Sequence, residues 1–402
     1  MRFTRRGRAL LALSLAFAAA GYVLAIRDFS VIGVALLVVV AVGAAAVWLR
    51  KGTVTVRRRV RPTKTMAGQD VQVELEIRAS GRLGWGPILL SDRVPDTLGE
   101  EVRLSIDRRR STRGRFVSYV VRPPVRGRYV LGPLRVLHTD PFGTLQRSEP
   151  VPGTASFIVY PSYEPVSTMP TGVQRLGIVR HSPLLGQGDE FYALRQYEDG
   201  DDLRKVHWPS SAKLGQVMIR QEELLGEPRL FVVLDTCASK HRGRAQHASI
   251  EAAISACASV TMLALERRMR VDVITANGRL LATRKPSDEE LLEGLAVLEP
   301  SARPDLSAAL ATVDPRRVGG AAAAVVVTPG LDKRELGLLA GLVSRTSSGA
   351  VVHVAAETFD PRPRRRRRPE LGHLGLPVLR LEAGASFRRV WETGIRHVAV
   401  AR

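Results

Sequence analysis

The chain has 402 residues and a formal net charge of +21, from 60 Lys and Arg against 39 Asp and Glu. This length exceeds one small domain, so we expect two or three domains, and the charge favours an anionic partner such as a lipid surface or a nucleic acid. Two cysteines, Cys237 and Cys257, exclude a disulfide-stapled scaffold and a cysteine zinc site, and they suit a reducing compartment.

Residues 1–51 are predicted to form a membrane hairpin. The apolar runs 10–26 and 29–49 contain no charged side chain, and Arg27 and Asp28 lie between them. Since about 17 to 20 helical residues cross a bilayer core, each run is long enough to span. A cleaved signal peptide is an alternative for the first run, although no small-residue cleavage site precedes a polar terminus. A buried hairpin of a soluble domain is the other alternative.

Basic residues flank this hairpin on both sides, whereas its connecting loop has one arginine and one aspartate. The flanking residues are Arg2, Arg5, Arg6, Arg8, Arg50, Lys51, Arg57, Arg58, Arg59 and Arg61. The positive-inside rule therefore predicts a two-helix plasma-membrane protein with both termini and the soluble domains in the cytoplasm. Such residues also meet anionic headgroups, so this cluster does not require nucleic acid.

Residues 52–163 alternate apolar and polar side chains, as in VTVRRRVRP, VQVELEIRAS and RFVSYVVRPP, with Gly and Pro between the runs. A period of two with short turns predicts antiparallel strands that bury one face. We therefore expect an antiparallel β-sandwich-like domain here. Its residues suggest no catalytic set.

Residues 228–402 change to continuous apolar strands that alternate with helices. RLFVVLD ends at Asp235, a helix is expected over 247–269, and Ser287 with Glu290 forms a capping box at the start of another helix. Further strands are expected in VDVIT, AAAAVVVTPG and VVHVAAE. This pattern predicts a doubly wound, mostly parallel sheet covered on both faces, with ligands at the carboxyl ends of its strands.

The stretch GQGDEFYALRQYEDGDDLRKVHWPSSAK, residues 186–213, concentrates charged and aromatic side chains. A calcium loop could use the carboxylates around Asp199, but Leu203 and Arg204 break the EF-hand register. An acid–base site could use Asp201, Asp202 and His207, but no nucleophile accompanies them.

A structural or partner-docking element fits this stretch at every position. Arg195 and Arg204 can pair with nearby carboxylates in bidentate fashion. Gly200 permits a tight turn, and Tyr197 and Trp208 supply apolar bodies to pack. We therefore favour paired ions around an aromatic–glycine turn.

The same stretch resembles the signature of the domain-of-unknown-function family 58. The matching residues are Gly188, Glu190, Phe191, Leu194, Arg195, Tyr197, Gly200, Asp201, Asp202, Arg204 and Trp208. RGRYVLGP and the DPFG of Asp140–Gly143 resemble the segment that precedes this signature. The resemblance implies two N-terminal membrane helices, a β-rich segment, a junction over 164–227 and a von Willebrand factor A-like domain over 228–402.

The resemblance also implies partners rather than an activity. Family members are found beside MoxR-type AAA+ ATPases and transglutaminase-like membrane proteins, and no established enzymatic activity accompanies the family. We therefore expect protein partners at a membrane and no nucleic acid.

A von Willebrand factor A-like domain usually carries a metal-ion-dependent adhesion site, in which Asp-x-Ser-x-Ser, a later Thr and a later Asp surround Mg²⁺. Here Cys237 replaces the middle serine, and Pro329 replaces the later aspartate. The oxygen donors that remain are Asp235, Ser239 and either Asp332 or Asp305. A degenerate magnesium site and a relic without metal both stay open, and no other cofactor is expected.

The loop 361–370 contains five contiguous arginines, Arg364, Arg365, Arg366, Arg367 and Arg368. Such a run could bind nucleic acid, or it could be a solvated loop beside an anionic membrane or an acidic partner. The hairpin already brings this domain to a bilayer, which favours the second interpretation.

Together these features predict a non-enzymatic, membrane-anchored cytoplasmic scaffold that docks to a MoxR-type AAA+ ATPase in assembly or cell-envelope-related processes. One alternative is a metal-dependent hydrolase that uses Asp235 with Asp201 and Asp202. The other is an anionic-polymer binder that acts through Arg364–Arg368.

Overall fold

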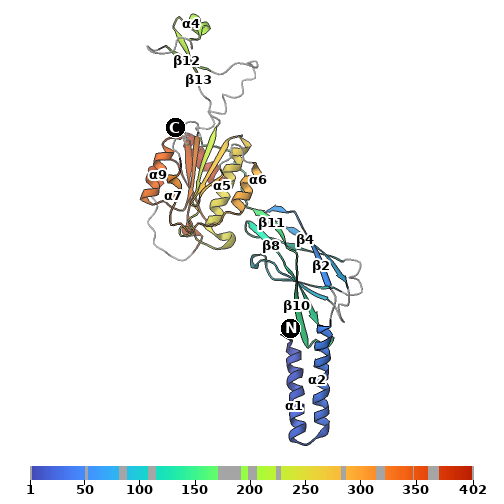
Figure 1. The fold of residues 1–402 in the computed structure, drawn as a ribbon. Coiled ribbons are helices and arrows are strands. Elements are labelled where there is room, and N and C mark those ends of the chain that lie inside the picture. The colour runs from blue at the N-terminus through green and yellow to red at the C-terminus, as the bar shows by residue number, and fades with distance from the viewer. Residues whose placement is uncertain are drawn as a thin grey trace. The chain divides into compact units, whose positions relative to one another are not determined.

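The computed structural model describes residues 2–49, 53–80, 88–106, 115–170, 192–197, 206–222, 228–281, 287–313, 322–346, 348–360 and 371–400. These residues fall into two compact units, Met1–Ser162 and Tyr163–Arg402 (Figure 1). The first unit contains apolar helices and antiparallel sheets, and the second contains a largely parallel sheet with helices. The predicted multidomain architecture is confirmed at this level.

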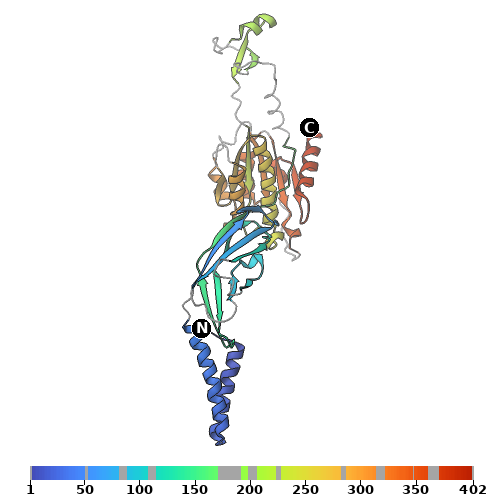
Figure 2. The same ribbon diagram turned by 90° about the vertical axis from the view of Figure 1, so that its right-hand side faces the viewer.

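The first unit begins with two long helices, α1 (Arg5–Val23) and α2 (Arg27–Trp48), which lie side by side in both views (Figures 1 and 2). Small residues let the two helices approach: a Cβ on Gly33 would lie 2.7 Å from the backbone nitrogen of Ala18, and Ser14 donates a 2.8 Å hydrogen bond to the Gly33 carbonyl. Close approach at small residues is typical of helix pairs in lipid.

Two of the described helices are long and apolar enough to cross a membrane, namely α2, with a mean hydropathy of 2.7, and α5 (Ser249–Glu266), with 1.3. Most of α5 is buried inside the second unit, so it is a core helix. The helix α1 starts at Arg5 rather than at the predicted residue 10, because Thr4 caps it by accepting from the Gly7 amide. Apolar helices of this kind are compatible with membrane anchoring.

The DPFG turn between β9 (Leu134–Thr139) and β10 (Leu145–Val151) contacts both helices of the hairpin. The backbone nitrogen of Thr4 donates to the Thr144 carbonyl at 3.0 Å, and a Cβ on Gly43 would lie 2.7 Å from Oδ2 of Asp140. Asp140 is itself buried and accepts hydrogen bonds from the Leu145 amide and the Thr144 hydroxyl. The hairpin is therefore packed directly against the strands of the first unit.

Three sheets complete the first unit, with strand orders β1-β10-β9-β5-β6, β2-β4-β7 and β3-β11-β8. Their ladders are antiparallel, except that β3 pairs with β11 in parallel. The remaining strands are β1 (Arg2–Phe3), β2 (Thr53–Arg61), β3 (Lys64–Met66), β4 (Val71–Ser80), β5 (Ile88–Asp92), β6 (Val102–Ile106), β7 (Arg115–Val121), β8 (Gly127–Leu131) and β11 (Ala155–Tyr160).

The core of this unit follows the predicted alternation of period two. Val71, Val73, Leu75 and Ile77 of β4 are all buried and join one hydrophobic cluster with side chains from the other sheets. Since successive side chains of a strand point to opposite faces, this spacing buries one face of β4.

A buried ion pair crosses from one sheet of this unit to another. The Arg58 guanidinium on β2 pairs with Asp92 on β5 and donates to the Leu131 and Gly153 carbonyls, while the Tyr119 hydroxyl donates to Asp92 at 2.6 Å. The prediction that Arg58 belongs to the basic flank at the membrane is therefore wrong. Its side chain is buried because it supplies the positive charge that the buried Asp92 carboxylate requires.

The second unit is built on a six-stranded sheet of order β16-β15-β14-β17-β18-β19. All its neighbours pair in parallel except the edge strand β16, which is antiparallel to β15. The strands are β14 (Arg229–Leu234), β15 (Arg270–Thr275), β16 (Gly278–Leu281), β17 (Ala322–Thr328), β18 (Ser348–Val354) and β19 (Val378–Leu381). The order reverses between β14 and β17, and such a switch point is where open α/β sheets bind ligands.

Helices cover both faces of this sheet, as Figure 1 shows for α5 on one side and α7 and α9 on the other. The other helices of this unit's sheet region are α6 (Asp288–Ala296), α7 (Ser307–Ala311), α9 (Lys333–Val343) and α10 (Phe387–Val400). Phe231 and Val233 of β14 pack with leucines of α7 and α9 in one hydrophobic cluster. Apolar contacts on both faces explain why these strands are continuous apolar runs.

The signature stretch contributes a small element of its own. The strand β12 (Tyr192–Gln196) pairs antiparallel with β13 (Met218–Glu222), and the short helix α4 (Trp208–Leu214) lies between them in sequence. His207 donates its backbone N–H to the Met218 carbonyl, and the Ser211 hydroxyl accepts from the Met218 amide. These bonds tie α4 to β13.

Candidate functional site

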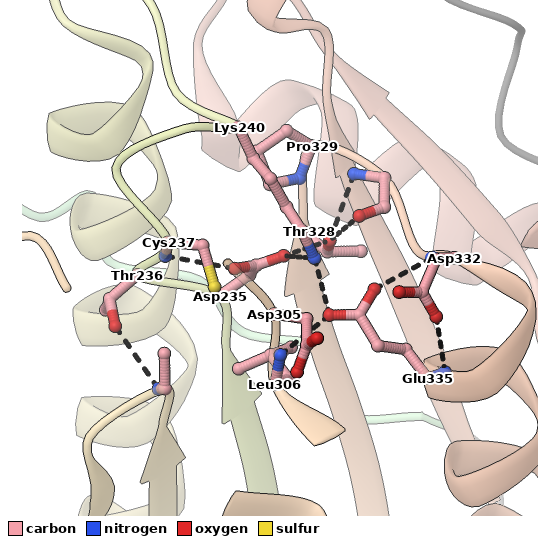
Figure 3. A network of polar contacts seen from close by, with 12 residues as sticks. Asp235, Thr236, Cys237, Lys240, Asp305, Leu306, Thr328, Pro329, Asp332 and Glu335 are labelled. Atoms are coloured by element: carbon pink, nitrogen blue, oxygen red, sulfur yellow. Dashed lines mark hydrogen bonds and ion pairs between the residues drawn. The ribbon is translucent and has the colours of Figure 1, made fainter. Parts of the chain in front are cut away.

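Polar side chains meet at the carboxyl ends of β14 and β17, beside the switch point of the sheet (Figure 3). Asp235 follows β14 directly, and Thr328 ends β17. Both residues are fully buried, and the Thr328 hydroxyl donates a 2.9 Å hydrogen bond to Oδ2 of Asp235. The parallel register of the two strands, which pairs Leu234 with Val327, brings these two ends together.

The ammonium of Lys240 lies between two carboxylates, as Figure 3 shows. Its Nζ is 2.9 Å from Oδ2 of Asp235 and 2.6 Å from Oε1 of Glu335. Burial alone would lower the pKa of Lys240, but the adjacent Asp235 and Glu335 carboxylates outweigh it and raise that pKa. Lys240 is therefore a permanent cation inside the fold.

Glu335 reaches the site from the first turn of α9. Its Oε2 accepts from the Asp332 amide at 2.7 Å, and Asp332 in turn accepts from the Glu335 amide, which makes a capping box. Its Oε1 also accepts from the Leu306 amide at 2.7 Å. A fully buried carboxylate needs such partners, so the same residue starts the helix and binds the ammonium.

The remaining contacts of Asp235 fix its orientation. Oδ1 accepts from the Cys237 amide at 3.1 Å, and the Asp235 carbonyl lies 2.7 Å from Nε2 of His241. Because a carbonyl can only accept, Nε2 of His241 carries a proton. Burial lowers the pKa of His241, although the hydrogen bond to Asp235 acts in the opposite direction. His241 is therefore a neutral support for the Asp235 backbone.

Residues 193–377 match the family model described as "Protein of unknown function DUF58". This part of the chain is similar to the DUF58 family. The match begins within β12, includes the Asp235–Lys240–Glu335 site and ends at the residue before β19. The resemblance predicted from the signature is thus confirmed.

The uncharacterized proteins Rv1480 of Mycobacterium tuberculosis and Mb1516 of Mycobacterium bovis are two relatives of this chain. Each is 31% identical over 118 residues, which cover 28% of this chain and 37% of the relative. The matched region thus spans little more than a third of the length of these relatives.

Two solved structures give weak matches to parts of this chain. The CARDB domain of a Pyrococcus furiosus protein, in complex with di-metal ions, is 15% identical, with a TM-score of 0.19 over 27% of this chain and 91% of that domain. The alkylpurine DNA glycosylase AlkC of Pseudomonas fluorescens, bound to DNA, is 9% identical, with a TM-score of 0.18 over 33% of this chain and 38% of the glycosylase. Similarities of this size carry no functional information for this chain.

The predicted metal donors differ in their surroundings and hydrogen bonds. Asp235 is central, whereas Ser239 is an exposed residue. Asp305 accepts from the Ser307 amide at the start of α7, and Asp332 caps α9. Within the described ranges, no group of three or more His, Cys, Asp or Glu side chains is placed to hold a metal ion.

Cys237 occupies the position of the expected middle serine, and its thiol is a poor ligand there. Burial, followed by the nearby Asp235 carboxylate, raises its pKa, so the thiol stays protonated. A thiol is also a soft ligand, whereas Mg²⁺ prefers hard oxygen ligands.

Sequence reasoning missed Lys240 and Glu335, and it gave no role to Thr328, the threonine of the predicted strand AAAAVVVTPG. One signal was present: Asp332-Lys-Arg-Glu335 is a capping-box pattern that follows directly on an apolar strand. Nothing in the sequence links Lys240 to Glu335, which lie 95 positions apart.

Much of the DUF58 signature lies outside the described residues. This applies to Gly188, Glu190, Phe191, Gly200, Asp201, Asp202 and Arg204, and also to the arginine run Arg364–Arg368. Leu194 and Arg195 lie on β12, where they pair with Arg220 and Ile219 of β13. The predicted ion pairs of this turn therefore stay a prediction.

Tyr197, His207 and Trp208 are described in this region, and Tyr197, which follows β12, is half-buried. Trp208, expected to pack, is 69% exposed at the start of α4. His207, considered as an acid–base residue, caps that helix instead, because its Nδ1 lies 3.3 Å from the Ser210 amide and 2.8 Å from the Ser210 hydroxyl. A capping imidazole with these two contacts is a structural group.

Proposed function

We propose that this chain is a non-enzymatic, membrane-anchored adaptor whose second unit is a von Willebrand factor A-like docking domain. The strand order β16-β15-β14-β17-β18-β19 with one antiparallel edge strand supports the domain assignment. The apolar hairpin with basic flanks supports anchoring in the plasma membrane with both soluble units in the cytoplasm. Similarity to a family without an established activity is consistent with a binding role.

The observation that carries the proposal is that the carboxylate of Asp235 is already hydrogen-bonded within the chain. Its two carboxylate oxygens already accept from the Cys237 amide, the Thr328 hydroxyl and the Lys240 ammonium. A hydrolase would need a carboxylate at this edge that faces a substrate, a metal ion or a water molecule. Asp235 faces groups of its own chain instead, which favours a structural centre over a catalytic one.

The β12–α4–β13 element supplies an exposed apolar surface for docking. Trp208 is 69% exposed, Leu214 59% and Val217 41%. Exposed aromatic side chains of this size are typical binding hot spots. The partner we propose is an AAA+ ATPase of the MoxR type, since the family resemblance implies that neighbour, with a transglutaminase-like membrane protein as the second partner that the resemblance implies.

Co-purification from detergent-solubilised membranes tests this proposal. The full chain is isolated with ATP, with ADP and without nucleotide, and co-purifying proteins are identified. We expect a MoxR-type ATPase in at least one nucleotide state. Its absence from all three preparations would refute the proposed partner, and recovery of the transglutaminase-like protein alone would assign the docking role to that protein.

A matched pair of variants then locates the surface. Trp208→Ala should weaken ATPase binding by about 2 kcal/mol, or roughly thirtyfold in Kd, as for an interface hot spot. Phe116→Ala removes an exposed aromatic from β7 of the first unit and should leave Kd unchanged. Equal effects of the two substitutions would contradict docking at α4.

A further inference from the structure

The residues at the carboxyl edge of the sheet do not fit the Mg²⁺ ion that a von Willebrand factor A-like domain is expected to hold. Oδ2 of Asp235 and Oε1 of Glu335 both face Nζ of Lys240. The Thr328 hydroxyl donates to Asp235 and accepts from the Gly330 amide at 3.0 Å. Magnesium requires several free oxygen ligands in octahedral geometry, and these oxygens are already used.

We propose that the Lys240 ammonium is the resident cation of this site, so that the domain keeps its Asp235–Thr328–Glu335 centre closed without a divalent metal. Removal of the ammonium would leave two buried carboxylates and a hydroxyl facing one another, a donor set that suits a divalent cation. This inference is separate from the adaptor role and does not depend on any partner.

Charge and geometry favour the tethered ammonium over a metal ion in the native chain. An ammonium has three donors and needs only a few acceptors, and Lys240 has two carboxylates within 3 Å. A second cation placed beside the same two carboxylates would repel the ammonium at short range, and burial would strengthen that repulsion. The Lys240 side chain is only 11% exposed. If it moved out of the site, the Asp235 and Glu335 carboxylates would lose their positively charged partner.

The same charges argue against capture of a partner's carboxylate at this point. In an adhesion site of the usual kind, the metal keeps one position open for an acidic side chain. Here one ammonium faces two carboxylates, Asp235 and Glu335, so the centre is negative and repels an added carboxylate. Docking of an acidic residue through a metal bridge is therefore excluded for the native site, and partners must bind elsewhere on the surface.

Mn²⁺ uptake by the full chain in detergent micelles tests the proposal, with free Mn²⁺ followed by electron paramagnetic resonance and stability followed by thermal unfolding. The native chain and Asp235→Asn should take up the same small amount, and millimolar Mn²⁺ should leave the Tm of the native chain unchanged. If the native chain took up more Mn²⁺ than Asp235→Asn, the proposal would be overturned, whatever the lysine variants show.

Lys240→Ala should take up about one additional Mn²⁺ per chain, and Mn²⁺ should raise its Tm. The double variant Lys240→Ala/Asp235→Asn should lose both effects, and Lys333→Ala, which removes an exposed lysine beside the site, should behave as the native chain. Lys240→Gln, which keeps a polar group at this position, serves as the second variant if the alanine chain does not fold. Folded variants that take up no more Mn²⁺ than the native chain would show that this is not a cation site.

Discussion

Nζ of Lys240 lies 2.6 Å from Oε1 of Glu335, although the two residues are 95 positions apart in the chain. One residue comes from the loop after β14 and the other from the first turn of α9, so the contact joins two segments that flank the switch point of the sheet. The pair therefore fixes how the loop after β14 meets the helix after β17.

Lys240→Met should destabilise the second unit by about 3–5 kcal/mol, because it keeps an unbranched apolar stem but leaves Asp235 and Glu335 buried without a cation. Urea unfolding followed by circular dichroism measures the change. Lys333→Met is the matched control, since Lys333 is exposed on α9, the helix that carries Glu335, and it should change stability by less than about 0.5 kcal/mol. Similar losses in both variants would mean that Lys240 has no special electrostatic role.

Arg58→Met should destabilise the first unit by about 3–5 kcal/mol, because Asp92 would stay buried with the Tyr119 hydroxyl as its remaining described side-chain donor. Arg122→Met breaks an ion pair with Asp70 in which both side chains are more than half exposed, so solvent screens the pair and the substitution should change stability much less than Arg58→Met does. Chemical denaturation of the two variants compares a buried pair with an exposed pair in one unit. A larger loss for Arg122→Met would contradict this assignment.

Gly43→Ala should destabilise the contact between the hairpin and the β10 turn, since its Cβ would lie 2.7 Å from Oδ2 of Asp140. We expect a lower Tm and faster proteolysis at the turn that contains Asp140. Gly337→Ala, on α9, has open space around the new Cβ and should instead stabilise by about 0.5–1 kcal/mol. Equal shifts of Tm for both substitutions would show that the close approach at Gly43 does not matter.

Glu392 should make the second unit sensitive to acid. Burial raises its pKa, but the hydrogen bonds that Thr168 and Ser167 donate to it outweigh this effect and lower the pKa from 4.5 to about 2. A carboxyl with a depressed pKa stabilises the fold above pH 4.5, and this stabilisation is lost as the pH falls toward 2. The Tm difference between the native chain and Glu392→Gln should therefore shrink over that window.

Glu382→Gln, which changes a carboxylate that is 54% exposed, is the control and should follow the native pH dependence. A Tm difference between the native chain and Glu392→Gln that stays constant from pH 4.5 to 2 would contradict the role of Glu392.

Elements with strong local patterns could be predicted from the sequence. The capping box of Ser287 and Glu290 is present at the start of α6, and the helix expected over 247–269 is α5 (Ser249–Glu266). The apolar strands that end at Asp235 and Thr328 are also confirmed. In each case neighbouring residues in the chain determine the local structure, either by a cap or by a hydrophobic period.

The centre of the candidate site could be predicted only in part, because its contacts join distant segments. Asp235 was identified from its place at the end of a strand, but Lys240 was not distinguishable from a solvated lysine. The sequence around its partner Glu335 indicates a helix-capping residue, and Glu335 does cap α9. Its contact with Lys240 depends in addition on how α9 packs against the sheet. Arg58 was misplaced at the membrane for the same reason: its partner Asp92 lies on another strand.

The turn at Asp140 gives the hairpin a further attachment to the first unit, in addition to the pairing of β1 with β10 and the covalent path through residues 50–52. A helix pair held at one point could swivel about the chain, but contacts from Thr4 and Gly43 to this turn oppose rotation. If the hairpin is embedded in a bilayer, its contacts with this turn fix the orientation of the strands β9 and β10 relative to the membrane. A change in bilayer thickness that tilts the helices would then also tilt the β-sheets that the turn joins to them.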